Sequence, residues 1–395
     1  MRYLTADFVF PIHSPPISKG VLVVDHNGKI TDVLDPEKDD IPTTLPLERL
    51  TGILCPGFVN SHCHLELSHL KGMFSQKKGL PEFIDEMVEK RNGNKEKILQ
   101  AMTDADSEMF AGGIVAVGDI SNETISSDIK LKSKIFYHTF VELFDIFPER
   151  TDSVFEKGLD IQKYFSEKGL NASIVPHSHY TVTFRLMKLI YENAKKSANI
   201  FCIHNQETIG ENEMFEKGTG LLIEKLQELT QAYTDWKPSG KSSLITFIEK
   251  FNPTIPIQLV HNTFATLSDV RSTFQNKDRT YWCFCVNANL FIENKLPDIP
   301  LFTKEKCILT VGTDSYASNT SLSILKELIT IGSNYPEISL TEMLTWATLN
   351  GANFLHLENQ FGSFEKGKKP GILLISNIDL KQLRLKNESK IHRLI

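Results

Sequence analysis

The stretch PGFVNSHCHLE at residues 56–66 decides how this chain is interpreted, because an apolar run leads directly into two histidines. Residues 53–64 have the composition of a buried strand, and side chains two apart in a strand point to the same face. We therefore expect His62 and His64 to converge at the end of that strand. Such a pair is often structural when it stands alone, so the rest of the chain has to decide its role.

Seven further runs of this kind follow, separated by stretches with helical periodicity. This alternation predicts repeated β-α units around a parallel sheet. Eight strands with intervening helices favour an α/β fold of the closed (β/α)8 TIM type over an open doubly wound sheet. The eight runs are residues 53–64, 113–121, 134–142, 171–181, 199–205, 256–263, 279–287 and 307–314.

Polar residues that bind metals or carry protons stand at the ends of several of these runs. The fifth run has His204 just before its last residue and Glu207 shortly after it, the sixth contains His261, and the eighth ends with Asp314. The carboxyl ends of barrel strands surround one mouth, where active sites are assembled. The sequence therefore predicts that these side chains meet His62 and His64 at one place.

The segments between the runs predict helices. Residues 71–112 and 208–250 carry periodic apolar residues between charges, and we expect a helix, a turn and a second helix in the latter. Ser339 and Glu342 have the spacing of a capping box that opens a helix.

The two chain ends are predicted to be β-rich. Residues 21–33 form two strand-like runs around Asn27 and Gly28, a strong hairpin signal. After Gly362, residues 371–376 again have the apolar composition of a strand. We expect this tail to pair with the N-terminal strands.

Composition narrows the class of protein. The 395 residues are 41% hydrophobic and 23% charged, with a net charge of −6, which gives no cationic surface for nucleic acid or for an anionic membrane. No export signal or run of about 18 apolar residues is found, and the six cysteines mostly lie in apolar runs that suit reduced thiols. We expect a cytoplasmic protein with a small-molecule partner, and a homodimer is compatible with this composition.

These motifs together resemble the amidohydrolase superfamily, in the branch that includes cytosine, guanine and aminodeoxyfutalosine deaminases and the triazine hydrolases. The resemblance covers nearly the whole chain. It implies a barrel of residues 55–362 and a small β-sandwich domain built from residues 1–54 and 363–395. The matching positions are residues 56–66, 177–181, His204, Glu207, His261, 312–315, Asn319, 350–352 and 362–367.

The resemblance implies that His62, His64, His204 and Asp314 bind one divalent metal. Three imidazoles and a carboxylate favour Zn2+, with Fe2+, nickel and cobalt as alternatives. Some relatives bridge two metals through a modified lysine at the end of the fourth strand. Residues 173–177 contain no lysine, which favours a single metal.

The implied reaction is attack of metal-activated hydroxide on an aminated ring carbon of a nitrogen heterocycle, with loss of ammonia. Glu207 occupies the position of the family's proton shuttle, which takes the water proton and delivers it to the ring nitrogen or the leaving group. His261 is expected to hold the water or polarise the electrophile, and Asp314 to orient the water. Read without the metal ligands, Glu207 would be a solvated carboxylate at a helix start.

The substrate is expected to be a purine, a pyrimidine or a nucleoside-like molecule. His177 matches a position that often faces the substrate. Glu66 continues the two-residue alternation from His64, so it either reaches the substrate or holds a ligand imidazole in its tautomer. His179 stands where proline is commoner in the family, which puts the pocket shape in doubt, and His69 and His138 are interpreted as structural.

Several alternatives stay open. The same chemistry could displace chloride or open a cyclic amide, and a noncatalytic scaffold could keep the barrel, although it would be expected to lose the ligands. The H-x-E half of the cytidine-deaminase signature occurs at His64 and Glu66 without its P-C-x-x-C partner, which disfavours that fold. Cys283 and Cys285 resemble a metal pair, but their apolar surroundings favour inert thiols.

Overall fold

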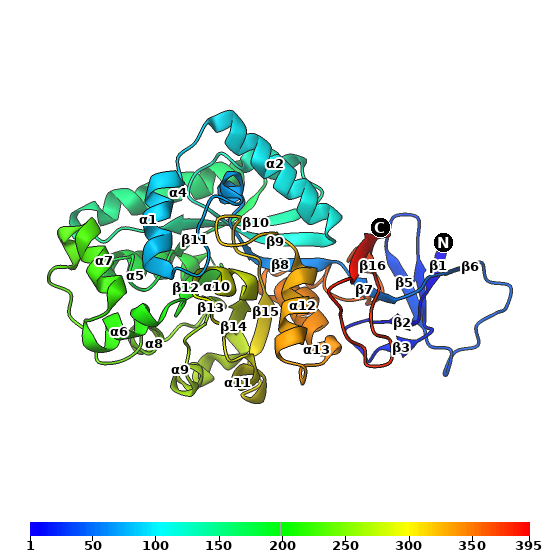
Figure 1. The fold of residues 1–395 in the computed structure, drawn as a ribbon. Coiled ribbons are helices and arrows are strands. Elements are labelled where there is room, and N and C mark those ends of the chain that lie inside the picture. The colour runs from blue at the N-terminus through cyan, green and yellow to red at the C-terminus, as the bar shows by residue number, and fades with distance from the viewer. Residues whose placement is uncertain (198) are drawn as a thin grey trace.

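A computed structural model describes residues 1–197 and 199–395. Figure 1 shows a larger part, in which helices surround strands, and a smaller β-rich part in which the N- and C-termini lie near each other. The two chain ends therefore share one region, and the middle of the chain forms the rest.

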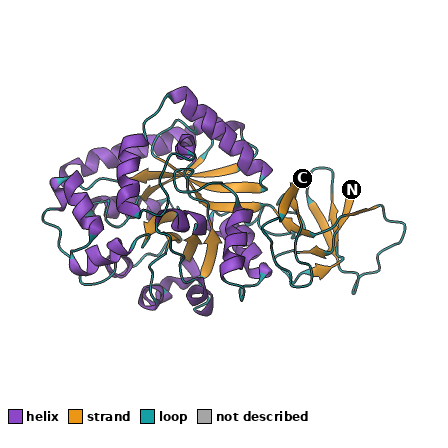
Figure 2. Ribbon diagram, in the orientation of Figure 1, coloured by secondary structure: helices purple, strands orange, loops and turns teal. Residues whose placement is uncertain are grey.

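Eight parallel strands form the centre of the larger part. They make two four-stranded sheets, whose edges are joined by single bridges between Cys63 and Asp314 and between Ser178 and His204. Nearly every residue of these strands is buried, because helices cover their outer faces (Figure 2). The strands are β8 (Phe58–Cys63), β9 (Ile114–Ser121), β10 (Phe136–Leu143) and β11 (Asn171–Pro176) in one sheet, and β12 (Phe201–Asn205), β13 (Ile257–His261), β14 (Thr280–Phe284) and β15 (Ile308–Val311) in the other.

The first predicted run is two strands rather than one. β7 (Ile53–Pro56) belongs to the small β-rich part, and the chain enters the larger part at Gly57 before β8 begins. A Cβ atom on Gly57 would lie 2.2 Å from Cγ1 of Val115 and 2.7 Å from the carbonyl oxygen of Pro370. Only glycine fits where the chain passes between the two parts.

Fourteen α-helices lie in the described residues, and none of them is both long and apolar enough to cross a membrane. The predicted capping box is confirmed: Ser339 and Glu342 each accept a hydrogen bond from the other's backbone N–H at the start of α13. The helices are α1 (Leu80–Lys90), α2 (Lys95–Ala111), α3 (Ser127–Lys132), α4 (Thr151–Glu167), α5 (Phe184–Lys196), α6 (Ile209–Lys217), α7 (Leu221–Leu229), α8 (Ser243–Phe251), α9 (Leu267–Ser272), α10 (Val286–Ile292), α11 (Ile299–Lys304), α12 (Ile324–Asn334), α13 (Leu340–Thr345) and α14 (Gly351–Phe354).

The long connection between β12 and β13 is more divided than the predicted helix, turn and helix. It contains α6, α7, a 3-10 turn at Gln231–Tyr233 and α8. The extra break comes from Gly218 and Gly220, whose φ angles of 71° and 106° are in the region that favours glycine. Gly218 ends α6, and Gly220 turns the chain into α7.

The predicted return of the tail is confirmed. β16 (Ile372–Ser376) pairs antiparallel with β7, with Leu373 opposite Cys55, and also pairs with β17 (Lys390–Arg393). This sheet continues through β2 (Phe8–Val9) and β3 (Ile17–Ser18). A second sheet, in the order β5-β4-β1-β6, contains β1 (Arg2–Thr5), β4 (Val21–Val24), β5 (Ile30–Leu34) and β6 (Leu47–Arg49).

The predicted hairpin around Asn27 and Gly28 is also confirmed, because β4 and β5 pair antiparallel. Side chains from both small sheets form one buried apolar cluster, which includes Leu4, Leu22, Leu54 and Ile372. This shared cluster is the physical reason that the two chain ends stay together.

Candidate metal centre and catalytic cavity

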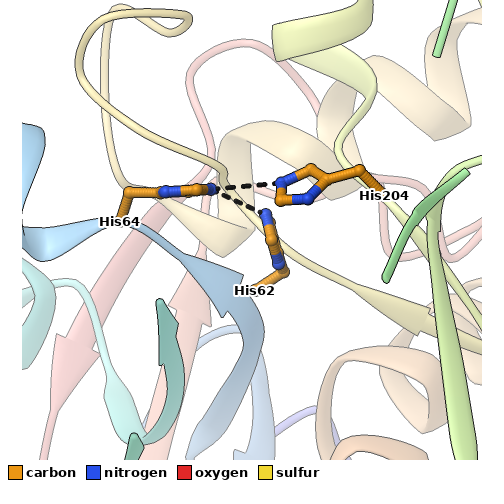
Figure 3. Close-up of side chains that lie close together, drawn as sticks. All are labelled: His62, His64 and His204. Carbon is orange, nitrogen blue, oxygen red and sulfur yellow. Dashed lines mark hydrogen bonds between the residues drawn. The ribbon is translucent and has the colours of Figure 1, made fainter. Parts of the chain in front are cut away.

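Three imidazoles converge at the carboxyl ends of β8 and β12. Nε2 of His64 lies 3.1 Å from Nε2 of His62 and 3.3 Å from Nε2 of His204 (Figure 3). His62 is within β8, His64 follows its last residue, and His204 is in β12. The expected convergence of the two imidazoles of the HxH pair is thus present, and the opposite sheet adds the third ring.

Asp314 brings a carboxylate to the same point from the end of β15. Its Oδ1 lies 3.3 Å from Nε2 of His64 and 3.5 Å from Nε2 of His62, and Ser318 donates a hydrogen bond to its Oδ2. The backbone N–H groups of Thr313 and Asp314 donate to the carbonyl oxygen of His62 over 3.0 and 3.1 Å. These bonds hold Asp314 in a left-handed conformation, with φ of 57°, that a non-glycine residue adopts only when its surroundings impose it.

Close backbone contact between β8 and β15 requires a glycine before Asp314. A Cβ atom on Gly312 would lie 2.8 Å from Cβ of His62 and 2.9 Å from its carbonyl oxygen. Gly312 therefore sets how near the carboxylate comes to the imidazoles.

The protonation states of these groups suit a cation. Burial lowers the pKa of His62 to about 4 and that of His64 to about 3, against the opposing influence of Asp314. Burial also opposes ionisation of Asp314, but the hydrogen bond with His62 and the charges of the nearby histidines hold its pKa well below the usual range. At neutral pH His62 and His64 are therefore neutral imidazoles beside the carboxylate of Asp314.

His204 has its lone pair turned toward the cluster. Its Nδ1 donates to the carbonyl oxygen of His177 over 2.8 Å, which leaves Nε2 unprotonated on a neutral ring. His62, His64 and His204 form one group of potential ligands, and His62, His261 and Asp314 form another. Unprotonated nitrogens and a carboxylate at such short separations fit a divalent metal.

His261 and Glu207 form a pair beside this cluster. Nδ1 of His261 donates to Oδ1 of Asn289 over 2.8 Å, so Nε2 carries the lone pair, and it lies 3.6 Å from Oε1 of Glu207. Burial, with a contribution from the charge of Asp314, raises the pKa of Glu207 to about 8. The geometry thus places a buried carboxyl group with a raised pKa next to the lone pair of an imidazole.

Residues 53–390 match the amidohydrolase family. The chain belongs to this family. An adenosine deaminase of Helicobacter pylori is 26% identical over 322 residues, which cover 80% of this chain and 77% of that relative. The solved structure of Helicobacter pylori aminofutalosine deaminase in complex with methylthio-coformycin has a TM-score of 0.81 at 22% identity, over 96% of this chain and 93% of that one. An adenosine deaminase from Xanthomonas campestris with bound zinc has a TM-score of 0.72 at 20% identity, over 98% of this chain and 87% of that one. The similarity to these solved structures shows that the amidohydrolase has a TIM-type α/β fold.

A cavity of about 270 Å³ opens over the cluster in this amidohydrolase. His64, His204 and Asp314 lie in its wall, together with Glu207 and His261. Much of the remaining wall is apolar and comes from α1 and its neighbours, namely Leu67, Leu80, Phe83, Ile84, Met87, Val88, Phe144, Leu226 and Ile292. The cavity therefore combines one polar region with a large apolar surface, as small-molecule sites usually do.

Of the two predicted substrate-binding residues, the structure brings only His177 to the cavity. Its ring lies 4.7 Å from that of His204, and its Nδ1 is 2.9 Å from Oγ1 of Thr181. Glu66 is not in the cavity wall: its carboxylate accepts hydrogen bonds from the backbone N–H groups of Asn122 and Glu123 over 2.9 and 3.3 Å. The alternation from His64 does not reach Glu66, because a 3-10 turn at Leu65–Leu70 follows the strand directly.

The other histidines are bonded elsewhere. Nε2 of His179 lies 3.0 Å from Oδ1 of Asn205, and His138 contacts Oγ of Ser173. His69 contacts the carbonyl oxygens of Glu66 and Arg91. Cys283 and Cys285 are fully buried among apolar side chains.

Several polar residues of this site were not predicted from the sequence. Asn289 orients His261, Ser318 donates to Asp314, and Glu142 lies in the cavity wall. Burial raises the pKa of Glu142, but the charges of His177, His204 and His64 and a hydrogen bond from Asn122 outweigh it and lower the pKa to about 2. The last position of the third predicted run is Glu142, so an acidic residue that ends a buried strand was the available signal.

Glu142, His177 and His204 form a further group that could hold a metal. Oε1 of Glu142 lies 3.5 Å from Nδ1 of His204, the atom that already donates to the carbonyl oxygen of His177. A metal at this point would have to displace that proton. The geometry thus favours one metal position, on the Nε2 side of His204.

Proposed function

We propose that this amidohydrolase hydrolytically deaminates an aminated nitrogen heterocycle. The observation that carries the proposal is that the histidine and aspartate cluster and the Glu207–His261 pair face one cavity. Both halves of such a reaction, activation of water and movement of a proton, need groups at one point. The relatives described above are named as deaminases of adenosine and aminofutalosine, which supports this reaction class.

We assign His62, His64, His204 and Asp314 as ligands of one divalent metal. Three imidazole nitrogens and a carboxylate favour zinc, with Fe2+ as the alternative. The zinc in the Xanthomonas campestris structure supports that choice. When bound, the metal supplies Lewis-acid activation of water at neutral pH.

Glu207 and His261 act on the proton and the substrate. Glu207 takes the proton released by the attacking water and passes it to the ring nitrogen or the departing amino group, so that ammonia leaves as a neutral molecule. His261, with its tautomer held by Asn289, directs the lone pair of Nε2 at the attacking water, from which it accepts a hydrogen bond. Asp314 orients the water.

His177 is assigned to the substrate side of the cavity, because it lies in the wall and its ring is 4.7 Å from that of His204. Glu66 fits better as a support for the loop that contains Asn122. The relatives described above support deamination more than chloride displacement or cyclic amide hydrolysis. A noncatalytic scaffold would not be expected to keep the complete cluster.

We further propose that residues 55–362 form a closed eight-stranded barrel and that residues 1–54 and 363–395 form a β-sandwich. The single bridges at the two sheet edges support the first, and the apolar cluster shared by the two small sheets supports the second. A cytoplasmic location is supported by six cysteines that form no disulfide.

The test is ammonia release by the zinc-loaded protein from a panel of purines, pyrimidines, their nucleosides and aminated pterins. We expect turnover of at least one aminated compound and its loss when a chelator removes the metal. An exposed residue of α6 offers a control: Glu216→Gln should leave turnover unchanged. Failure of a metal-loaded, folded protein to release ammonia from any member would overturn the proposal.

A further inference from the structure

Glu142 has a carboxylate oxygen without a partner in the wall of the catalytic cavity. Glu142 is the next-to-last residue of β10 and is only 6% exposed, yet its Oε1 forms no hydrogen bond with any described residue. A buried polar atom of this kind calls for a ligand or another function, because nearly all such atoms in folded proteins are paired. The proposed mechanism does not use Glu142.

The neighbours of Glu142 fix its side chain and leave Oε1 free. Nδ2 of Asn122 donates to the carbonyl oxygen of Glu142 over 3.0 Å and to its Oε2 over 3.1 Å. Oδ1 of Asn122 in turn accepts a hydrogen bond from Arg91. Asn122 and Arg91 also lie in the cavity wall. This wall therefore offers a fixed acceptor beside a guanidinium donor.

The chemistry of this wall favours hydroxyl groups. A free carboxylate oxygen accepts from N–H or O–H donors, but a cationic substituent would meet the positive charge of Arg91. A phosphate would meet Glu142, Glu207 and Asp314, and among the described residues of the wall Arg91 is the only arginine or lysine. Hydroxyl groups carry no charge and both donate and accept, so they match both kinds of group.

Glu142 lies on the other side of His204 from the proton-carrying pair. The ring of His204 lies between His177, at 4.7 Å, and His261, at 5.5 Å, as expected from the order of β11, β12 and β13. Glu142 approaches Nδ1 of His204, whereas Glu207 approaches His261. A substrate whose amino group reacts beside Glu207 can therefore extend a substituent toward Glu142.

We propose that Glu142 determines substrate specificity by accepting hydrogen bonds from the hydroxyl groups of a glycosyl substituent. The substrate class is then an uncharged aminated ribonucleoside, not a free base or a nucleotide. This inference rests on the proposed deamination. It assigns Glu142 a direct contact with the substrate, in contrast to a positioning role through His204.

The experiment compares kcat/KM of the zinc-loaded protein for adenosine, 2′-deoxyadenosine, 3′-deoxyadenosine, adenine and adenosine 5′-monophosphate. Loss of a hydroxyl that bonds a carboxylate should lower kcat/KM by roughly tenfold or more. We expect adenosine to be preferred over all the others. Equal use of adenosine and both deoxy analogues, or a preference for adenine or the nucleotide, would overturn the inference.

Glu142→Gln should reduce kcat/KM for adenosine more than for the deoxy analogues, and so reduce the preference for adenosine over these analogues. Asp145→Asn is the matched control, because Asp145 is a buried carboxylate just after the end of β10 but is not in the cavity wall. This variant should keep the preference for adenosine over the deoxy analogues. An equal loss for every substrate, accompanied by weaker zinc binding, would show a positioning role and overturn the inference. If the variant does not fold, the analogue series on the unaltered protein still decides the question.

A second readout does not depend on turnover. Purine riboside lacks the amino group, and calorimetry should show that it binds the zinc-loaded protein more tightly than its 2′-deoxy analogue does. Glu142→Gln should remove this difference. If no adenine compound is deaminated while another heterocycle of the panel is, the inference fails and the proposed function stands. If nothing in the panel is deaminated, the proposed function fails first.

Discussion

Oε1 of Glu207 lies 3.6 Å from Nε2 of His261, although 54 positions separate the two residues along the chain. The hydrogen bond of Nδ1 with Asn289 leaves the lone pair of His261 on the side of Glu207. Because Glu207 is buried beside an acceptor, it is suited to hold a proton and to release it within the cavity.

The first prediction concerns that proton. Glu207→Gln keeps the size of the side chain but cannot accept or deliver a proton, so kcat should fall by roughly two to four powers of ten. The metal should stay bound, because none of the proposed ligands is changed. Steady-state ammonia release and direct substrate binding measure the effect, with Glu216→Gln at an exposed position of α6 as the control. Near-normal kcat in a metal-loaded Glu207→Gln protein would rule out the shuttle role.

The second prediction concerns metal content. The purified protein should bind about one zinc-class ion per chain, because the cluster offers one set of three imidazoles and a carboxylate. His62→Ala should deplete the ion, and elemental analysis of dialysed protein measures it. His69→Ala, which removes an imidazole bonded only to backbone carbonyl oxygens, should leave the content unchanged. Two tightly bound ions per chain would contradict the single-metal assignment.

The third prediction concerns the contact between β8 and β15. Gly312→Ala would put a Cβ atom 2.8 Å from Cβ of His62, so the strands must separate and move Asp314 away from the imidazoles. We expect a loss of about 1–3 kcal/mol in the free energy of unfolding and weaker zinc binding. Denaturant titration and metal competition measure these effects.

Gly332→Ala provides the control for this substitution. Its added Cβ atom would lie 3.3 Å from the flexible end of Met343. It should change stability little and should not affect zinc binding. Normal zinc affinity in Gly312→Ala would show that the spacing of the two strands does not set the metal site.

The fourth prediction concerns pH. Ser243 donates a hydrogen bond to the buried carboxyl group of Glu211, and burial raises the pKa of Glu211 to about 8. The folded protein then keeps a proton that the unfolded chain loses near pH 4.3, a typical pKa of an exposed glutamate. The contribution of this proton to the free energy of unfolding is fully present below the pKa of Glu211 in the unfolded chain. It declines as pH rises toward 8, by at most about 1.4 kcal/mol per pH unit.

Glu211→Gln cannot ionise and should remove this decline. The variant should gain stability relative to the unaltered protein as pH rises from 5 to 8, and denaturant unfolding at several pH values measures the difference. Glu216→Gln, at an exposed position of the same helix, should follow the unaltered protein. A constant difference between Glu211→Gln and the unaltered protein across this range would contradict the assignment.

Much of the fold and of the cluster could be predicted because local rules act over short distances. Strand periodicity placed His62 and His64 on one face, and the topology of β-α units brought His204, His261 and Asp314 to the same edge. The capping box and the hairpin depend on a few neighbouring residues, and the structure contains both. Such features follow from backbone geometry that does not depend on the rest of the chain.

The sequence by itself therefore determined which residue types stand at the strand ends and which chemistry they can support. Tertiary structure alone decided that Glu142, and not Glu66, joins Glu207 and Asp314 as a carboxylate in the cavity wall. The 3-10 turn after β8 directs Glu66 to the backbone of Asn122, whereas Glu142 is still within β10 and lies in the cavity wall. The reason is that strand alternation stops where the strand stops, and beyond that point the direction of a side chain depends on contacts between segments distant in sequence.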